Sequence, residues 1–137
     1  MTAMLVDTSV WSLALRRDSI PANPEVRELR RAIEAGTPQV TTGLILQEIL
    51  QGFSGPRARQ SIIERFSALP LVAPQRADHI AAAELRNRCR RAGLQLGTID
   101  ALLAQLCVRH GLTLLTTDQD FLRAARHCTL RVWKSAH

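Results

Sequence analysis

Four acidic residues occupy positions that are unusual for acids in a small globular protein. Asp7 directly follows the apolar run "AMLV", and Asp118 follows "LTLLTT", so each comes after a segment expected to be a buried strand. Glu48 lies in "LILQEIL", at the flank of an apolar helical stripe. Asp100 shares a helical stripe with apolar residues three, four and seven positions later. A carboxylate in such surroundings is costly to bury unless a cation meets it.

If these acids converge in one crevice, the site has a definite chemistry. Carboxylates packed together resist joint ionisation unless a cation neutralises them. Mg²⁺ and Mn²⁺ suit the purpose because they take oxygen ligands and keep several waters. The absence of His and Cys from the set argues against zinc. Such an ion activates water and stabilises charge on phosphate, so the set predicts phosphodiester hydrolysis.

Taken singly, each acid also has a simpler explanation. Asp commonly caps a helix, so "DTS" and "TTDQD" could serve only to begin helices. Asp100 lies in the first turn of a predicted helix, where an acid suits the helix dipole. Glu48 could be an ordinary glutamate at the edge of an apolar stripe. We interpret Asp120 as a cap or as a peripheral acid, and the other four together favour a shared site.

The elements that must position these acids alternate between strands and helices. Apolar runs predict strands at 3–7, 38–42, 69–72, 112–117 and 129–133. Amphipathic runs predict helices at 9–17, 24–36, 43–53, 57–69, 76–92, 98–111 and 119–127, with Thr98 as the N-cap of the sixth. This alternation indicates one α/β domain, residues 1–137, with a parallel sheet between helices. Ligands of such sheets bind at the carboxyl ends of the strands, where Asp7 and Asp118 lie.

Composition limits the classes of partner and compartment. The chain has 137 residues, 46% of them hydrophobic, and a formal net charge of +6. A basic surface favours nucleic acid as a partner because phosphate contacts release counterions. Its three cysteines are widely spaced and form no CxxC pair, which is typical of reduced thiols in a cytoplasmic protein. We expect neither a signal peptide nor a membrane-spanning segment.

Four stretches in order resemble the PIN-domain ribonucleases, and among them the VapC-type toxins of bacterial toxin–antitoxin pairs. They are "VDTSVW" at 6–11, "LQEIL" at 46–50, "TIDALLAQLC" at 98–107 and "LLTTDQDF" at 114–121. The resemblance implies a three-layer α/β/α sandwich with strand order 3-2-1-4-5. It identifies the metal-binding acids as Asp7, Glu48, Asp100 and Asp118. It also implies that Thr8 or Ser9, and Thr117, help to position metal, water or phosphate.

The resemblance further implies an activity and partners. The expected activity is a Mg²⁺- or Mn²⁺-dependent endoribonuclease that cleaves single-stranded or loop RNA, such as tRNA or rRNA, and inhibits translation. Its products would carry 3′-hydroxyl and 5′-phosphate ends. The expected partners are a second copy of the chain and a cognate antitoxin. The stretch "VWSLAL" at 10–15 is apolar enough to serve as antitoxin or dimer surface, or to belong to the chain's own core.

A cluster of acids repels the phosphates of RNA, so RNA binding needs positively charged residues around the acidic site. We refer to such residues as the positive rim. The best candidate is "RNRCRR", which contains Arg86, Arg88, Arg90 and Arg91 near the end of a long predicted helix. The alternative is a solvated helix end, where arginine suits the dipole. These residues lead into the loop before Asp100, which places them near the predicted site.

Two other classes of protein are alternatives to a nuclease: a receiver module and a non-catalytic RNA-binding module. A phosphorylated receiver module would need paired acids after the first strand and an acid after the third, yet Asp7 is followed by Thr8 and residues 70–75 contain no acid. It would also need a lysine in the pocket, whereas Lys134 follows the last predicted strand. A non-catalytic RNA-binding module stays open, because the positive charge supports binding without proving turnover.

Overall fold

The computed structural model describes residues 2–16 and 23–136, which form seven helices and four strands. In chain order these are β1 (Met4–Val6), α1 (Thr8–Leu15), α2 (Pro24–Glu34), β2 (Gln39–Val40), α3 (Gly43–Gly52), α4 (Pro56–Ser67), α5 (Arg76–Arg91), α6 (Thr98–His110), β3 (Thr113–Leu115), α7 (Gln119–Ala124) and β4 (Arg131–Val132). The alternation predicted from the sequence is therefore confirmed. The first predicted helix was extended to Arg17, which lies outside the described residues.

The strands form a parallel sheet in the order β2-β1-β3-β4. β1 is central, and Leu5 pairs with Val40 on one side and with Leu114 on the other. The strand predicted at 69–72 is reduced to one parallel bridge between Thr41 and Leu71, beside β2. Pro70 limits this pairing because proline has no amide hydrogen to donate. With the bridge counted as the outermost strand, the order is the 3-2-1-4-5 that the resemblance implied.

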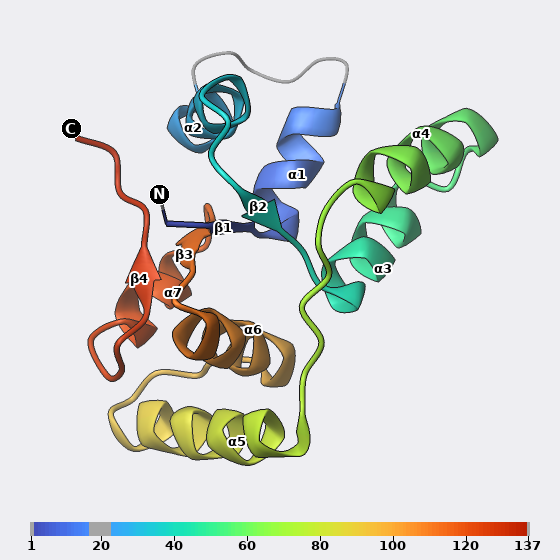
Figure 1. Ribbon diagram of the computed structural model, residues 1–137. Coiled ribbons are helices and arrows are strands. Elements are labelled where there is room, and N and C mark those ends of the chain that lie inside the picture. The colour runs from blue at the N-terminus through green and yellow to red at the C-terminus, as the bar shows by residue number, and fades with distance from the viewer. Residues whose placement is uncertain (1, 17–22, 137) are drawn as a thin grey trace.

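Helices cover the sheet on both sides, which gives the three-layer arrangement (Figure 1). α1 and α2 lie on one side and α5 and α6 on the other, while α3 and α4 project as a pair. Because both faces are covered, β1 and β3 are apolar on both faces, and Leu5, Val6 and Leu114 are completely buried. In the described part of the chain, no helix has the length and apolar character to cross a membrane.

Local signals explain most helix boundaries. The Asn23 side chain accepts a hydrogen bond from Val26 N at 2.9 Å, and Thr42 caps α3 in the same way. α6 ends at Gly111, whose φ of +64° is a left-handed conformation that favours glycine. The predicted N-cap at Thr98 is wrong, since Gly97 occupies the cap position and Thr98 is the first helical residue.

α5 and α6 pack antiparallel, and a buried ion pair joins one end of the pair. Asp78, which is fully buried, accepts a hydrogen bond from Arg109 Nε at 2.7 Å and another from Gln105. At the other end, Arg86 Nε donates to the carbonyl oxygen of Leu96 at 2.9 Å. The first turn of α6 is therefore held beside the C-terminal half of α5, and this arrangement fixes where Asp100 lies.

Candidate active site

Asp7 directly follows β1 and is held by two hydroxyl groups. Ser9 Oγ and Thr116 Oγ1 each donate a hydrogen bond to Asp7 Oδ2 at 2.8 Å. Asp7 occupies the N-cap position of α1, yet its side chain makes no capping hydrogen bond. Among the described residues nothing donates to Oδ1, so one carboxylate oxygen is fixed and the other is available to a ligand. Helix capping therefore does not account for this acid.

Thr116 is a site residue that the sequence analysis missed. Its hydroxyl donates to Asp7 and accepts a hydrogen bond from Asp118 N at 3.0 Å, so it joins the ends of β1 and β3. Thr117, which the resemblance favoured, contributes its backbone N–H to Ser9 Oγ at 3.1 Å. The register of the two strands explains this contact, because Val6 pairs with Leu115 and the next residues along the two strands are Asp7 and Thr116.

Glu48 reaches the site from α3. Ile45 and Ile49 of this helix point into the core, which leaves Glu48 exposed at the rim. Thr8 Oγ1 donates to Glu48 Oε1 at 3.3 Å and so connects the first residue of α1 to α3. Thr8 and Ser9 thus meet different acids, Glu48 and Asp7 respectively.

Asp100 is the point on which the other acids converge. Burial raises its pKa, and the negative charges of Asp7, Asp118, Glu48 and Asp120 raise it further, to about 6. Charges act in this way only when they are near one another. Gly97 packs closely against this carboxylate, because a Cβ at residue 97 would lie 3.4 Å from Asp100 Oδ2. The other three predicted acids are therefore near enough for their charges to act on Asp100.

Asp118 and Asp120 have different roles at the start of α7. Asp118 is a true N-cap, since its Oδ1 accepts a hydrogen bond from Asp120 N at 2.9 Å. It also contributes negative charge to the site. Asp120 does not cap the helix and pairs instead with Arg123 Nη1 at 2.8 Å. Of the two interpretations of Asp120, the peripheral acid is correct.

No cation of the described chain neutralises the four acids. The ion pairs among the described residues are Arg31 with Glu28, Arg109 with Asp78 and Arg123 with Asp120. Within the same residues, no three His, Cys, Asp or Glu side chains are yet close enough to chelate an ion. The donors are all carboxylate or hydroxyl oxygens, which fit a hard divalent cation. An ion would have to draw them together.

Cys107 argues against a thiolate ligand. Burial, with a smaller contribution from the charge of Asp7, raises the pKa of this thiol to about 12. The thiol therefore stays protonated, and only the thiolate is a strong metal ligand. The three cysteines are free, as the sequence analysis expected.

The predicted arginines lie near the C-terminus of α5 and differ in their contacts. Arg86 is committed to the Leu96 carbonyl oxygen, and Arg90 Nη2 donates to Asn87 Oδ1 at 3.1 Å. Arg88 and Arg91 are exposed. Arg86 therefore has a structural role in the loop before Asp100, and RNA binding by the four residues stays a prediction.

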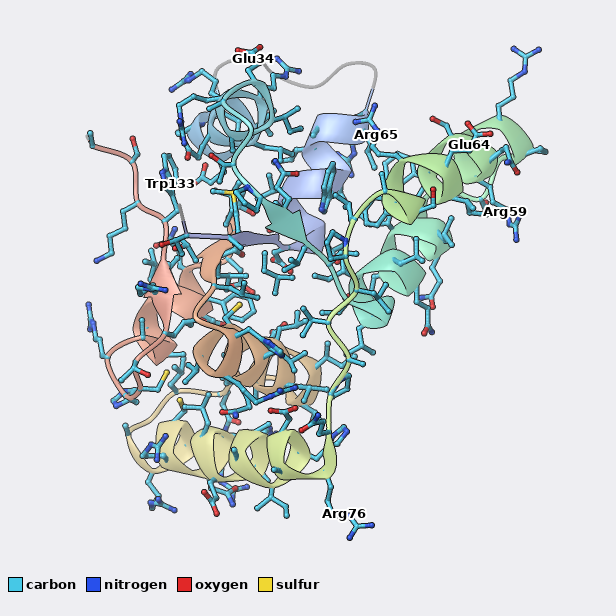
Figure 2. The ribbon with its side chains drawn as sticks, viewed as in Figure 1. Glu34, Arg59, Glu64, Arg65, Arg76 and Trp133 are labelled. Atoms are coloured by element: carbon cyan, nitrogen blue, oxygen red, sulfur yellow. The ribbon has the colours of Figure 1, made fainter. Side chains whose placement is uncertain are left out.

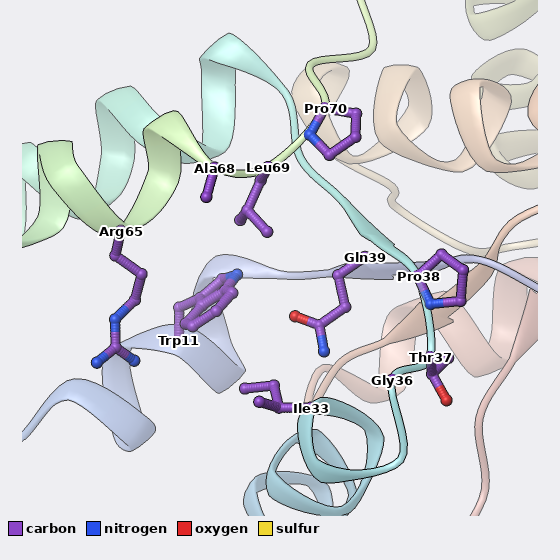
Figure 3. A pocket seen from close by; sticks show the side chains of 10 residues that line it. All are labelled: Trp11, Ile33, Gly36, Thr37, Pro38, Gln39, Arg65, Ala68, Leu69 and Pro70. Carbon is purple, nitrogen blue, oxygen red and sulfur yellow. The ribbon is translucent and has the colours of Figure 1, made fainter.

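A separate apolar groove of about 620 Å³ opens between α1, α2 and α4 (Figure 3). It is lined by Trp11, Ile33, Gly36, Thr37, Pro38, Gln39, Arg65, Ala68, Leu69 and Pro70. Trp11 is only 2% exposed, and its Nε1 has no hydrogen-bond partner among the described residues. Ile33 is 51% exposed at the side of the groove. The stretch at 10–15 thus belongs mainly to the core, with Trp11 also lining the groove.

Comparison with known proteins identifies the family and supports the fold. The family model described as "PIN domain" matches residues 4–127. Ribonuclease VapC11 of Mycobacterium tuberculosis is 32% identical over 130 residues, which cover 93% of this chain and 96% of the relative. VapBC2 from Rickettsia felis, solved with a promoter DNA fragment, has a TM-score of 0.74 at 18% identity and covers 96% and 98% of the two chains. FitAcB from Neisseria gonorrhoeae has a TM-score of 0.69 at 19% identity, with 96% of each chain covered.

Proposed function

The chain belongs to the PIN-domain family, and we propose that it is a divalent-metal-dependent endoribonuclease that serves as the toxin of a toxin–antitoxin pair. The observation that carries the proposal is the convergence of Asp7, Glu48 and Asp118 on Asp100, with no cation of the described chain to neutralise them. The ribonuclease with which it shares 32% identity over nearly its whole length supports the same activity.

Asp7, Asp100 and Asp118 hold Mg²⁺ or Mn²⁺ in this proposal, and Glu48 supports that ion or a second one. A bound ion lowers the pKa of water and stabilises charge on the phosphate and the leaving oxygen. Ser9 and Thr116 fix one oxygen of Asp7 and leave the other to bind. Glu48, at the rim, orients the attacking water by accepting a hydrogen bond from it. Cleavage of this kind would leave 3′-hydroxyl and 5′-phosphate ends.

Metal removal provides the first test of activity. EDTA should stop degradation of a mixed single-stranded RNA substrate, and added Mg²⁺ or Mn²⁺ should restore it. Glu48→Gln should slow cleavage strongly, because the amide cannot replace the carboxylate. Glu64→Gln is the matched control, since Glu64 projects from α4 (Figure 2) and, among the described residues, its side chain hydrogen-bonds with Gln60 alone. Cleavage that persists in EDTA would overturn the metal-dependent mechanism.

A non-catalytic RNA-binding function is the second candidate, favoured by the net charge of +6. The EDTA experiment separates the two, because simple binding produces no cleavage products. In either function, Arg86, Arg88, Arg90 and Arg91 are proposed to form part of a positive rim beside Asp100. Replacing Arg90 and Arg91 with Gln should make RNA binding less dependent on salt, and an unchanged dependence would exclude them.

The proposed antitoxin binds the apolar groove between α1, α2 and α4. Several structurally similar proteins were solved as toxin–antitoxin complexes, and the lining of the groove includes an exposed isoleucine, Ile33, and an arginine, Arg65. An apolar antitoxin segment with an acidic side chain would complement both. Ile33→Arg should abolish neutralisation by the co-expressed antitoxin while RNA cleavage by the isolated chain continues. Loss of cleavage itself would instead indicate damage to the toxin fold.

A homodimer is also proposed. Ile80 on α5 and Ile99 on α6 are 57% and 43% exposed, which is unusual for large apolar residues. Ile99 also lines a concave region of about 360 Å³ between α5 and α6. Packing of Ile80 and Ile99 against a second copy of the chain would remove both side chains from water. Light scattering of the purified chain, compared with an Ile80→Arg variant, should show a dimer only without the substitution.

A further inference from the structure

A basic concavity of about 490 Å³ runs along α7, and its lining includes none of the four acids already described. It is lined by Gln119, Leu122, Arg123, Ala125, Arg126 and Lys134. Gln119 is the first residue of α7 and directly follows Asp118, so one end of the concavity adjoins the acidic site. Nothing in the proposed mechanism uses these residues.

The other end of the concavity lies at the same edge of the sheet as the acids. Trp133 N donates to the carbonyl oxygen of Leu114 at 2.9 Å, so the chain stays paired with β3 for one residue beyond β4. Lys134 therefore leaves the sheet at the carboxyl end of the strands, the edge at which Asp7 and Asp118 also follow their strands. The concavity thus extends the acidic site along one edge of the molecule.

Two of the three cations that line the concavity have no ion-pair partner among the described residues. Arg126 and Lys134 are exposed and belong to none of the ion pairs formed among the described residues. Arg123, which also lines the concavity, pairs with Asp120 at 2.8 Å. Unpaired cations in a hollow surface concentrate anions there.

We infer that this concavity binds the phosphate backbone of RNA next to the scissile bond, an inference that rests on the proposed ribonuclease function. Arg126 and Lys134 contact successive phosphates, and Gln119 offers an amide to a sugar hydroxyl near the acids. None of the described residues that line the concavity is aromatic, so these residues offer no stacking surface for bases. Phosphate contacts position a strand without reading its sequence. The site therefore sets the direction of the strand rather than the cleavage sequence.

The test is the salt dependence of RNA binding by an Arg126→Gln/Lys134→Gln double variant. Both proteins carry Asp100→Asn so that the RNA stays intact, and the probe is a labelled single-stranded RNA of about 20 nucleotides. Loss of two phosphate contacts should reduce the slope of log K against log salt by about 1.4, because each contact on a single strand contributes about 0.7. The control is Arg57→Gln/Arg59→Gln, which removes the same charge from α4, where Arg59 projects away from the body (Figure 2).

A slope that is unchanged, or that falls equally in the control, would overturn the inference. Normal RNA binding combined with loss of binding to an acidic antitoxin peptide would also overturn it, and would assign the concavity to a protein partner. Cleavage assays in the Asp100-containing background separate this inference from the proposed function. There, the double variant should raise KM for the long RNA and leave a dinucleotide substrate unaffected. No cleavage by the unsubstituted chain with Mn²⁺ would contradict the ribonuclease function, and the slopes would still decide the concavity.

Discussion

Asp78 and Asp100 belong to the same pair of helices and experience opposite electrostatic surroundings. Burial alone would raise the pKa of Asp78, but hydrogen bonds from Arg109, the Gln75 N–H and Gln105, with the charge of Arg109, lower it below its usual value. Asp100 has no such partner among the described residues, and burial together with neighbouring acids raises its pKa to about 6. The more deeply buried acid is therefore the more readily ionised one.

The contrast distinguishes an acid that holds the fold from acids that await a ligand. Asp78 is neutralised within the chain, and its ion pair fixes the antiparallel packing of α5 on α6. The acids around Asp100 repel one another and so destabilise the fold. A bound external cation would relieve this repulsion. Perturbed carboxyl groups of the second kind are typical of functional sites.

The largest expected effect comes from Asp100→Asn. The substitution removes a proposed metal ligand and also relieves repulsion, so RNA cleavage should fall by about three orders of magnitude while the fold is kept. Cleavage kinetics and circular dichroism of the same preparation measure both effects. Undiminished cleavage, in a preparation free of contaminating nuclease, would show that Asp100 is not part of the site.

Asp78→Ala should reduce the stability of the fold, whereas Asp100→Asn should reduce cleavage and keep the fold. It leaves Arg109 partly buried without its partner, so the free energy of unfolding should fall by about 3 kcal/mol, at the low end for buried ion pairs because Arg109 is 31% exposed. Urea denaturation measures the loss. Glu84→Ala, at an exposed position of α5, should change stability by less than about 0.5 kcal/mol. Equal losses of unfolding free energy in the two variants would show that the ion pair of Asp78 with Arg109 has no special role in stability.

Thr116→Val tests how precisely Asp7 must be held. The change keeps the shape of the side chain and removes its hydrogen bond to Asp7, so metal affinity should fall about 10- to 100-fold, as for other residues that orient a metal ligand. Titration calorimetry with Mn²⁺ measures it. Thr113→Val, on the same strand, is the control, and an equally large loss there would point to a general effect on β3.

The smallest effect is a dependence of stability on pH. Because the folded-state pKa of Asp100 lies above its usual value of 3.8, the folded chain binds this proton more tightly than the unfolded chain. Stability without metal should therefore fall as pH rises from about 4 to about 6, and this fall should be absent in Asp100→Asn. Mn²⁺ should restore the lost stability above that window. Identical pH profiles for the two proteins would contradict the raised pKa of Asp100.

The sequence was most informative where strands end. Asp7 and Asp118 could be assigned to one edge because parallel strands share an edge, and that reasoning needs no side-chain geometry. Thr116 was missed because its role depends on the register of β1 and β3, which only the paired strands reveal. The strand predicted at 69–72 is present only as one parallel bridge, because Pro70 has no amide hydrogen to donate.

Other features depend on contacts between helices, which local sequence patterns do not reveal. Asp78 and Arg109 are 31 residues apart and meet only because α5 and α6 run antiparallel. Likewise, "RNRCRR" reads as a uniform basic segment, whereas Arg86 turns to the Leu96 carbonyl oxygen and its neighbours do not. Helix positions could thus be predicted, while the contacts between helices could not.

The most direct test of the central claim is anomalous diffraction from crystals soaked with Mn²⁺ at about pH 7.5, above the raised pKa of Asp100. We expect the strongest anomalous peak to lie among the carboxylates of Asp7, Asp100 and Asp118, within ligand distance of their oxygens. A fully soaked crystal with no peak there, or with its strongest peak elsewhere on the chain, would contradict the account.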